Sequence, residues 1–362
     1  SEGSRRMLPV LFRIVIPASL AKPLVVVLAV GIAAVRAFLM RRRAAADGQP
    51  ISFWRALWED KVTVAILAVL AAVLWRAGYL DEELRIPLHT YGLLLALGFV
   101  IAIYMAQREA KRQGQDAEAI GDLSFWILVA ALVGSRVYYI FVNWDEYFGA
   151  NAMVATRIGR IPRLLAVWEG GLVFYGGFIA SVLTAWWYMR RRNMHFLTYA
   201  DTMIPSVALG HFFGRLGCFS AGCCWGQVSH AHLPWLAEFP PESLAYQSFA
   251  ARADPSQYLA PDRLHTLPLH PTQLYEAGGE LLLFLLLVTV VRPRKRFHGQ
   301  VLAIWLMAYA VLRYVVESFR GDVERGVVAG LGVGAWTSIA IFAVGAAIFA
   351  AGWRRATAAA VA

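Results

Sequence analysis

Long apolar stretches separated by short polar or basic segments run through the chain. Seven follow residue 87, at roughly 88–107, 123–143, 170–189, 198–220, 274–291, 300–319 and 328–351. Each is long enough to cross a bilayer as a helix, which takes about 20 mostly apolar residues. Two more precede them, at roughly 14–39 and 62–79. Lys22 and Pro23 interrupt the first of these, which predicts either a spanning helix or a broken, interfacial one.

The pattern therefore predicts an all-α polytopic membrane protein of eight or nine helices. We expect a membrane-anchor extension at 1–87, a seven-helix core at 88–353 and a tail at 354–362. The longest loop of the core, 221–273, is predicted to form a small head.

Basic residues predict how these helices are oriented. They follow alternate apolar stretches in short groups at 41–43, 108–112, 190–192, 292–296 and 354–355. If every stretch spans the bilayer, the groups fall on one side, which the positive-inside rule makes cytoplasmic. The C-terminus is then cytoplasmic, and the loops 144–169, 221–273 and 320–327 are external.

Composition supports a membrane protein. Hydrophobic residues make up 59% of the chain and charged residues 16%, against roughly 45–50% and about 25% in soluble domains. The net charge of +10 suits loops that face anionic lipid, and we expect no nucleic-acid partner. The absence of an inverted repeat argues against a transporter.

Ionisable residues inside the apolar stretches are candidate functional groups, because each costs roughly 2.5–3.5 kcal/mol or more to insert. They are Arg136, Glu169, Asp201, His211, Arg215, Arg313 and Glu317. The arginines lie toward the external ends of their helices, where cations suit an anionic phosphate head group. Gly214 and Gly217 flank Arg215 and allow a ligand or another backbone to approach it.

Several of these residues also have a structural interpretation. Arg313 and Glu317 are spaced for an intrahelical ion pair, Arg136 could snorkel to the interface, and His211 could be a hydrogen-bonded core histidine. Tyr175, Gly176 and Gly177 could serve helix packing alone.

The three cysteines offer a second choice of interpretation. Cys218, Cys223 and Cys224, with His211 or His230, could supply four metal ligands, but their spacing does not match a structural zinc site. We therefore expect small thiols in a tight turn and no metal.

Several segments together resemble the prolipoprotein diacylglyceryl transferase family. GRLGCFSAGCCWG resembles its GRxGNFxNGExxG signature, and LHPTQLYEA resembles its HPxQLYE segment. YGLLLALGF, WEGGLVFYGG and LRYVVESFRGD are similar to further family segments in the same order. The resemblance covers about 88–325 and implies a seven-helix transferase core.

The resemblance implies a reaction as well as a fold. The family transfers the diacylglyceryl group of phosphatidylglycerol to the lipobox cysteine of a preprolipoprotein, forming a thioether and releasing glycerol phosphate. It implies a site toward the external face of the bacterial cytoplasmic membrane and no metal or organic cofactor. We expect a monomer whose other contacts are with membrane lipid.

The expected catalytic residues are Arg215, Arg313, Glu317, Tyr175 and His270. The expected substrate-binding residues are Tyr91, Arg136, Gly176, Gly177, His211, Cys218, Gly226, Gln273, Tyr275 and Glu276. Preorganised cations at the departing phosphate should lower the barrier, and we assign that role to Arg215 and Arg313, with Glu317 orienting Arg313.

The chain departs from the family pattern at three positions. Cys218 stands where the family usually has Asn, Cys223 where it usually has Glu, and Tyr175 where it usually has a His proposed as a base. A tyrosine with a pKa near 10 is a poor base, so His270 or His211 could take the proton instead. The departures also allow a catalytically altered homologue that binds lipid or uses another acceptor.

Overall fold

The structure is a computed structural model that describes residues 10–16, 18–46, 52–61, 64–65, 68, 72, 84–148, 153–156, 159–162, 173–231, 233–321, 327–328 and 331–361. The chain divides into two compact units. The larger contains residues 1–11, 89–139 and 172–362, and the smaller contains 12–88 and 140–171.

Residues 12–87 of the predicted N-terminal extension belong to the smaller unit, whereas residues 1–11 belong to the larger one. Strand β1 (Val10–Ile16) pairs with β2 (Leu84–His89), and α1 (Ala18–Ala46) packs on α2 (Phe53–Glu59). Helix α6 (Trp144–Phe148) and the hairpin of β3 (Met153–Thr156) and β4 (Gly159–Pro162) complete it.

Helix α1 runs through Lys22 and Pro23 without a break. Proline near the start of a helix removes only one backbone hydrogen bond, so the helix continues. The second predicted stretch, 62–79, lies almost entirely outside the described residues.

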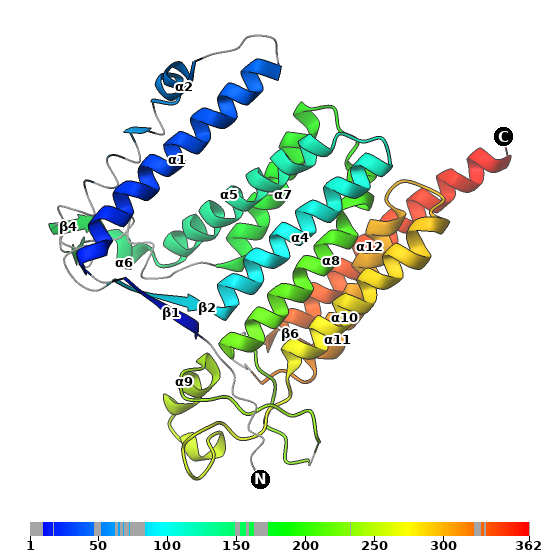
Figure 1. The fold of residues 1–362 in the computed structure, drawn as a ribbon. Coiled ribbons are helices and arrows are strands. Elements are labelled where there is room, and N and C mark those ends of the chain that lie inside the picture. The colour runs from blue at the N-terminus through cyan, green and yellow to red at the C-terminus, as the bar shows by residue number, and fades with distance from the viewer. Residues whose placement is uncertain are drawn as a thin grey trace. The chain divides into compact units, whose positions relative to one another are not determined.

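The seven apolar stretches of the core each form a helix in the larger unit (Figure 1). They are α4 (Thr90–Arg112), α5 (Ala117–Val142), α7 (Phe174–Arg191), α8 (Phe196–Ala221), α10 (Thr272–Leu286), α11 (Gln300–Glu317) and α12 (Val333–Val361). A π-helical turn, η4 (Leu287–Val291), and a 3₁₀ turn, η5 (Arg292–Arg294), extend α10. Six of the described helices are long and apolar enough to cross a membrane. The predicted class, an all-α polytopic membrane protein, is confirmed.

Helix α8 is central to the larger unit, because α4, α10 and α11 all pack against it. Helix α12 packs against α11. A short strand pair, β5 (Val327–Val328) and β6 (Leu331–Gly332), precedes α12.

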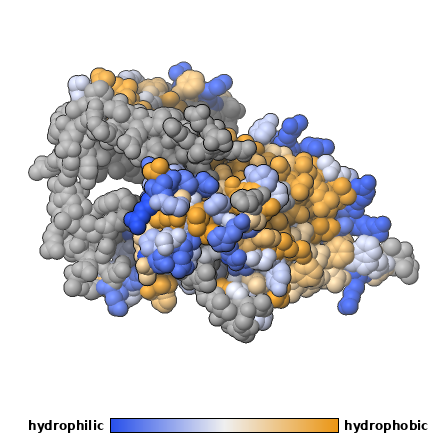
Figure 2. All heavy atoms as spheres, turned by 90° about the horizontal axis from the view of Figure 1, so that it is seen from below, coloured by the Kyte–Doolittle hydropathy of each residue, from blue (hydrophilic) through white to orange (hydrophobic). Residues whose placement is uncertain are grey.

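A small head follows α8. Gly222, in the left-handed conformation with φ of 66°, ends that helix and turns the chain into the head. The head contains α9 (Leu244–Ala250) and η3 (Pro255–Gln257). Its core residues are Ala237, Phe239, Ala245, Phe249, Leu259 and Leu269. In Figure 2, hydrophilic residues gather at the centre of the view and hydrophobic ones cover the flank of the bundle.

The basic groups of α4, α7 and α10 lie at the end of the bundle opposite the head (Figure 1). Arg292 Nη1 is 3.2 Å from Glu109 Oε2, which joins the C-terminal ends of α10 and α4. Arg190 and Arg191 lie over the exposed rings of Trp186 and Trp187. Aromatic and basic side chains together are typical of a membrane–water interface.

Asp201 has a structural role at this basic end. Its carboxylate is buried and accepts hydrogen bonds from the backbone N–H groups of Gly299 (2.7 Å) and Leu302 (3.0 Å). These are N–H groups that the start of a helix leaves without intrahelical partners. Lys295 Nζ, 3.3 Å away, compensates its charge. A side chain of α8 therefore caps α11.

We predict that Asp201→Ala lowers the thermal unfolding midpoint of the detergent-solubilised protein. Each buried N–H left without a partner costs about 1–3 kcal/mol. Asp122→Ala is the matched control, because the Asp122 side chain is 60% exposed and 3.7 Å from Arg192, and surface pairs contribute about 0–1 kcal/mol. Equal midpoints for the two variants would contradict the capping role.

Candidate active site

Three packed helices carry polar side chains at intervals of one helical turn. Residues four apart lie on one face of a helix, so each set forms a row. Helix α8 contributes His211 and Arg215, α10 contributes Glu276 and Glu280, and α11 contributes Trp305, Tyr309, Arg313 and Glu317. These rows form three connected layers, which we call the polar ladder.

The deepest layer is built on Glu280, which is fully buried. Its carboxylate lies 2.6 Å from His211 Nδ1 and accepts a hydrogen bond of 3.2 Å from Trp305 Nε1. Arg215 Nε donates to His211 Nε2 at 3.2 Å. Because Nε2 accepts, the proton resides on Nδ1 and the imidazole is neutral. Both ring nitrogens of His211 are therefore engaged.

The middle layer is built on Glu276, which is also fully buried. Its Oε1 accepts hydrogen bonds from Arg215 Nη2 (2.8 Å) and the Tyr309 hydroxyl (3.2 Å). Its Oε2 lies 3.9 Å from Arg313 Nη1. A buried carboxylate needs such compensation, and in return Glu276 fixes both guanidinium groups.

The outer layer joins α11 to α12. Arg313 Nη2 is 2.6 Å from Glu317 Oε2, and the Glu317 carboxylate packs against Gly334, where any Cβ would collide with it. Among the described residues, buried Arg313 Nη1 has no hydrogen-bond partner. That N–H remains available to a ligand.

The segment that precedes α10 clamps the loop that follows α8. Gln273 Nε2 donates to the carbonyl of Cys223 at 2.6 Å, and the Thr272 hydroxyl donates to the carbonyl of Cys224 at 2.8 Å. Gly226 N–H donates to the carbonyl of His270 at 3.0 Å. A Cβ at Gly226 would lie 2.7 Å from the Phe319 carbonyl oxygen. The backbone segments at Gly226 and Phe319 can therefore approach this closely only because residue 226 is glycine.

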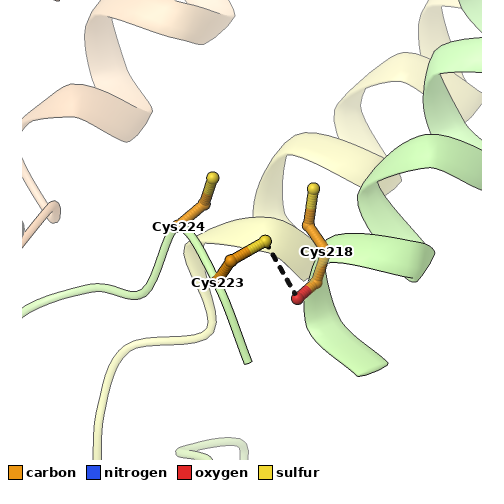
Figure 3. Close-up of side chains that lie close together, drawn as sticks. All are labelled: Cys218, Cys223 and Cys224. Atoms are coloured by element: carbon orange, nitrogen blue, oxygen red, sulfur yellow. Dashed lines mark hydrogen bonds between the residues drawn. The ribbon is translucent and has the colours of Figure 1, made fainter. Parts of the chain in front are cut away.

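The side chains of the three cysteines lie close together (Figure 3). Cys218 lies on the last turn of α8, one turn beyond Arg215, and the sulfur atoms of Cys218, Cys223 and Cys224 lie within 4.8 Å of one another. The Cys223 thiol donates a hydrogen bond of 3.6 Å to the carbonyl oxygen of Cys218. The convergence of the three cysteines was not expected from their spacing.

Tyr91 and His270 border the same region. A Cβ at Gly217 would lie 3.0 Å from the ring of Tyr91, which places that ring against the last turns of α8. His270 Nδ1 is 3.0 Å from the Tyr275 hydroxyl, and its ring packs against Phe319. Among the described hydrogen bonds, none involves His270 Nε2.

Four expected site residues lie on α5 and α7, outside the three helices of the ladder. Arg136 is buried on α5, and Tyr175 is half exposed at the start of α7. Gly176 and Gly177 bring the two helices together: a Cβ at Gly177 would lie 2.9 Å from the Ala131 carbonyl oxygen. Helix packing accounts for both glycines.

Other residues of the site were missed by the sequence analysis: Glu280, Trp305, Tyr309 and Arg320. The first three follow from helical spacing, because Glu280 lies one turn from Glu276, and Tyr309 and Trp305 lie one and two turns from Arg313. Arg320 is buried next to Gly226, with which it forms a β-bridge. Its place in the quoted segment LRYVVESFRGD was the available signal.

Comparison with known proteins shows similarity to one family over most of the chain. The profile of the family described as prolipoprotein diacylglyceryl transferase matches residues 82–351. A protein of Finegoldia magna is 32% identical over 232 residues, 64% of this chain and 79% of its own. One of Photorhabdus laumondii is 33% identical over 265 residues, 72% of this chain and 87% of its own. One of Proteus mirabilis is 31% identical over 282 residues, 75% of this chain and 90% of its own.

All three relatives are named phosphatidylglycerol–prolipoprotein diacylglyceryl transferase. The matched region takes in every helix that contributes to the polar ladder. The resemblance seen in the sequence is thereby confirmed, and the chain belongs to the prolipoprotein diacylglyceryl transferase family.

Proposed function

We propose that this protein transfers the diacylglyceryl group of phosphatidylglycerol to the lipobox cysteine of preprolipoproteins, releasing glycerol phosphate. The names of its relatives identify the two substrates. The observation that carries the proposal for this chain is the pair of arginines on buried Glu276, with one Arg313 N–H unpartnered. The names of the relatives give no support to the alternative, a catalytically altered homologue.

Arg215 and Arg313 are the proposed phosphate-binding groups. As the bond between the glyceryl carbon and the phosphate oxygen breaks, negative charge grows on that oxygen. Cations already held in place stabilise this charge without reorganising, in a site from which most water is excluded. Glu276 supplies the rigidity, and Glu317 orients Arg313.

His211 is proposed to position Arg215, because both of its nitrogens are engaged. His270 is proposed as the base that takes the proton from the acceptor thiol. The hydroxyl of Tyr275 holds its Nδ1, which leaves Nε2 to accept the proton. Tyr175 lies outside the ladder and has no proposed chemical role.

The orientation of the bundle completes the proposal. If the basic end faces the cytoplasm, the ladder and the head lie at the external face of the bacterial cytoplasmic membrane and the C-terminus is cytoplasmic. Phosphatidylglycerol then enters from the outer leaflet beside a single protein chain. Residues 1–87 are proposed to anchor the protein.

The first test is the phosphate-binding role of Arg215. We expect Arg215→Lys to lower transfer from labelled phosphatidylglycerol to a lipobox peptide by at least about 100-fold. Arg215 contacts His211 through Nε and Glu276 through Nη2, and the single nitrogen of a lysine cannot occupy both positions and also reach a phosphate. Arg294→Lys, at the basic end, is the control, and a peptide with serine for cysteine gives the background. Wild-type rates for Arg215→Lys would refute the role.

The role of His211 is tested by comparing two variants. The amide of His211→Gln can both donate to Glu280 and accept from Arg215, so we expect transfer within about tenfold of wild type and an unchanged pH profile. His211→Ala should lose more, because Arg215 is left without its second support. If glutamine is as inactive as alanine, His211 is the base and our assignment is wrong.

The role of His270 is tested by His270→Gln. Loss of a general base costs about 10²–10⁴-fold, and the remaining activity should lose its dependence on pH near neutrality. The backbone carbonyl that binds Gly226 is unchanged by this substitution. His230→Gln, on an exposed histidine of the head, is the matched control. Full activity of His270→Gln would remove it from the mechanism.

A further inference from the structure

The cysteine cluster has features that small packed thiols do not need. The three cysteines are all that the chain contains, and they come from the end of α8 and the loop that directly follows it. The described hydrophobic core of the head contains none of them. Cys224 adopts a φ of 61°, which residues other than glycine rarely take. Gln273 and Thr272 hold the carbonyl groups of Cys223 and Cys224 in place.

The sulfur positions fit a metal ion. Zinc binds thiolate sulfur at about 2.3 Å, which puts two sulfurs of a tetrahedral site about 3.8 Å apart. The sulfurs here lie within 4.8 Å of one another, so small rotations of half-buried side chains bring all three to that distance. Soft thiolate ligands select ions such as Zn²⁺.

The site offers three ligands where zinc usually takes four. Among the described residues, no fourth histidine, cysteine or carboxylate joins the group. Zinc sites with three protein ligands keep the fourth position for water or a substrate. Here that position adjoins the phosphate-binding layer, because Cys218 is one turn beyond Arg215 on α8.

We propose that Cys218, Cys223 and Cys224 bind a zinc ion whose open position takes the cysteine thiol of the acceptor peptide. This inference rests on the proposed function, of which it specifies one step. It also gives a single reason for two departures from the family pattern, the cysteines at 218 and 223.

The zinc ion would keep the acceptor sulfur as a thiolate at neutral pH, since a thiol that binds zinc loses its proton. That proton passes to His270. The sulfur forms a bond to the glyceryl carbon, the carbon–oxygen bond to the phosphate breaks, and its electrons remain on the departing glycerol phosphate dianion. The products are the thioether, glycerol phosphate and protonated His270, which returns its proton to water.

The test uses the full-length protein purified in detergent with a non-chelating reductant. We expect one zinc ion per chain by elemental analysis, and X-ray absorption showing three sulfur neighbours at about 2.3 Å. A lipobox peptide should raise the number of sulfur neighbours of the zinc ion from three to four, whereas a peptide with serine for cysteine should not. Cys218→Ser, Cys223→Ser and Cys224→Ser should each weaken zinc binding at least tenfold. His230→Ala, at an exposed histidine of the head, should not.

Removal of the metal tests whether transfer depends on the bound zinc ion. Stripping the zinc should lower transfer at least 100-fold, and added Zn²⁺ should restore it. A metal-free protein with three titratable thiols that transfers at the full rate overturns the inference and leaves the proposed function intact, as does a disulfide within the cluster. Zinc bound by the three sulfurs and the peptide thiol, without any transfer, upholds the metal site and overturns the proposed function.

Discussion

The carboxylate of Glu276 is the group on which the site depends. A negative charge with no access to water must be neutralised by neighbours, and Arg215 and Arg313 do so from two different helices. The same requirement holds in reverse, since neither arginine would be stable at this depth without an anion. The attraction therefore sets the distances between α8, α10 and α11, and it places two cations side by side where they would otherwise repel.

Opposite ends of α8 use buried carboxylates for different purposes. At the basic end, the Asp201 side chain on α8 accepts backbone N–H groups of α11 and stabilises the bundle. Near the head, carboxylates of α10 hold side chains of α8 and α11. In the second arrangement, the Nη1 donor of Arg313 has no hydrogen-bond partner among the described residues. A buried donor without a partner needs a physical explanation, and the phosphate-binding role proposed for Arg313 supplies one.

Helical spacing made much of the fold and part of the candidate site predictable from the sequence. Apolar stretches of sufficient length predicted the seven core helices, and buried charge marked Arg215, Arg313 and Glu317. Depth along a helix does not predict which helix faces meet, and the structure places Arg136 on α5 and Tyr175 on α7, apart from the three helices of the polar ladder. Pro23 was expected to weaken α1, but its place near the helix start makes its effect small. The meeting of the three sulfurs depends on a left-handed turn and on carbonyls held by α10, neither of which a spacing rule contains.

The order of the layers gives a physical reason for placing the proposed chemistry near one end of the bundle. Glu280 and Glu276 are inaccessible to water, whereas the side chains of Arg215 and Glu317 are 16% and 18% exposed and the thiols are half buried. Electrostatic interactions strengthen as water is excluded, but a charged head group loses more hydration the deeper it is drawn. The phosphate of the proposed lipid substrate would keep part of its hydration at the outer layer. It would there contact arginines whose positions are fixed by the buried carboxylates of the deeper layers. The acyl chains can meanwhile stay against the exposed apolar faces of the helices. The site thus lies at the depth where positioning is rigid and desolvation is incomplete.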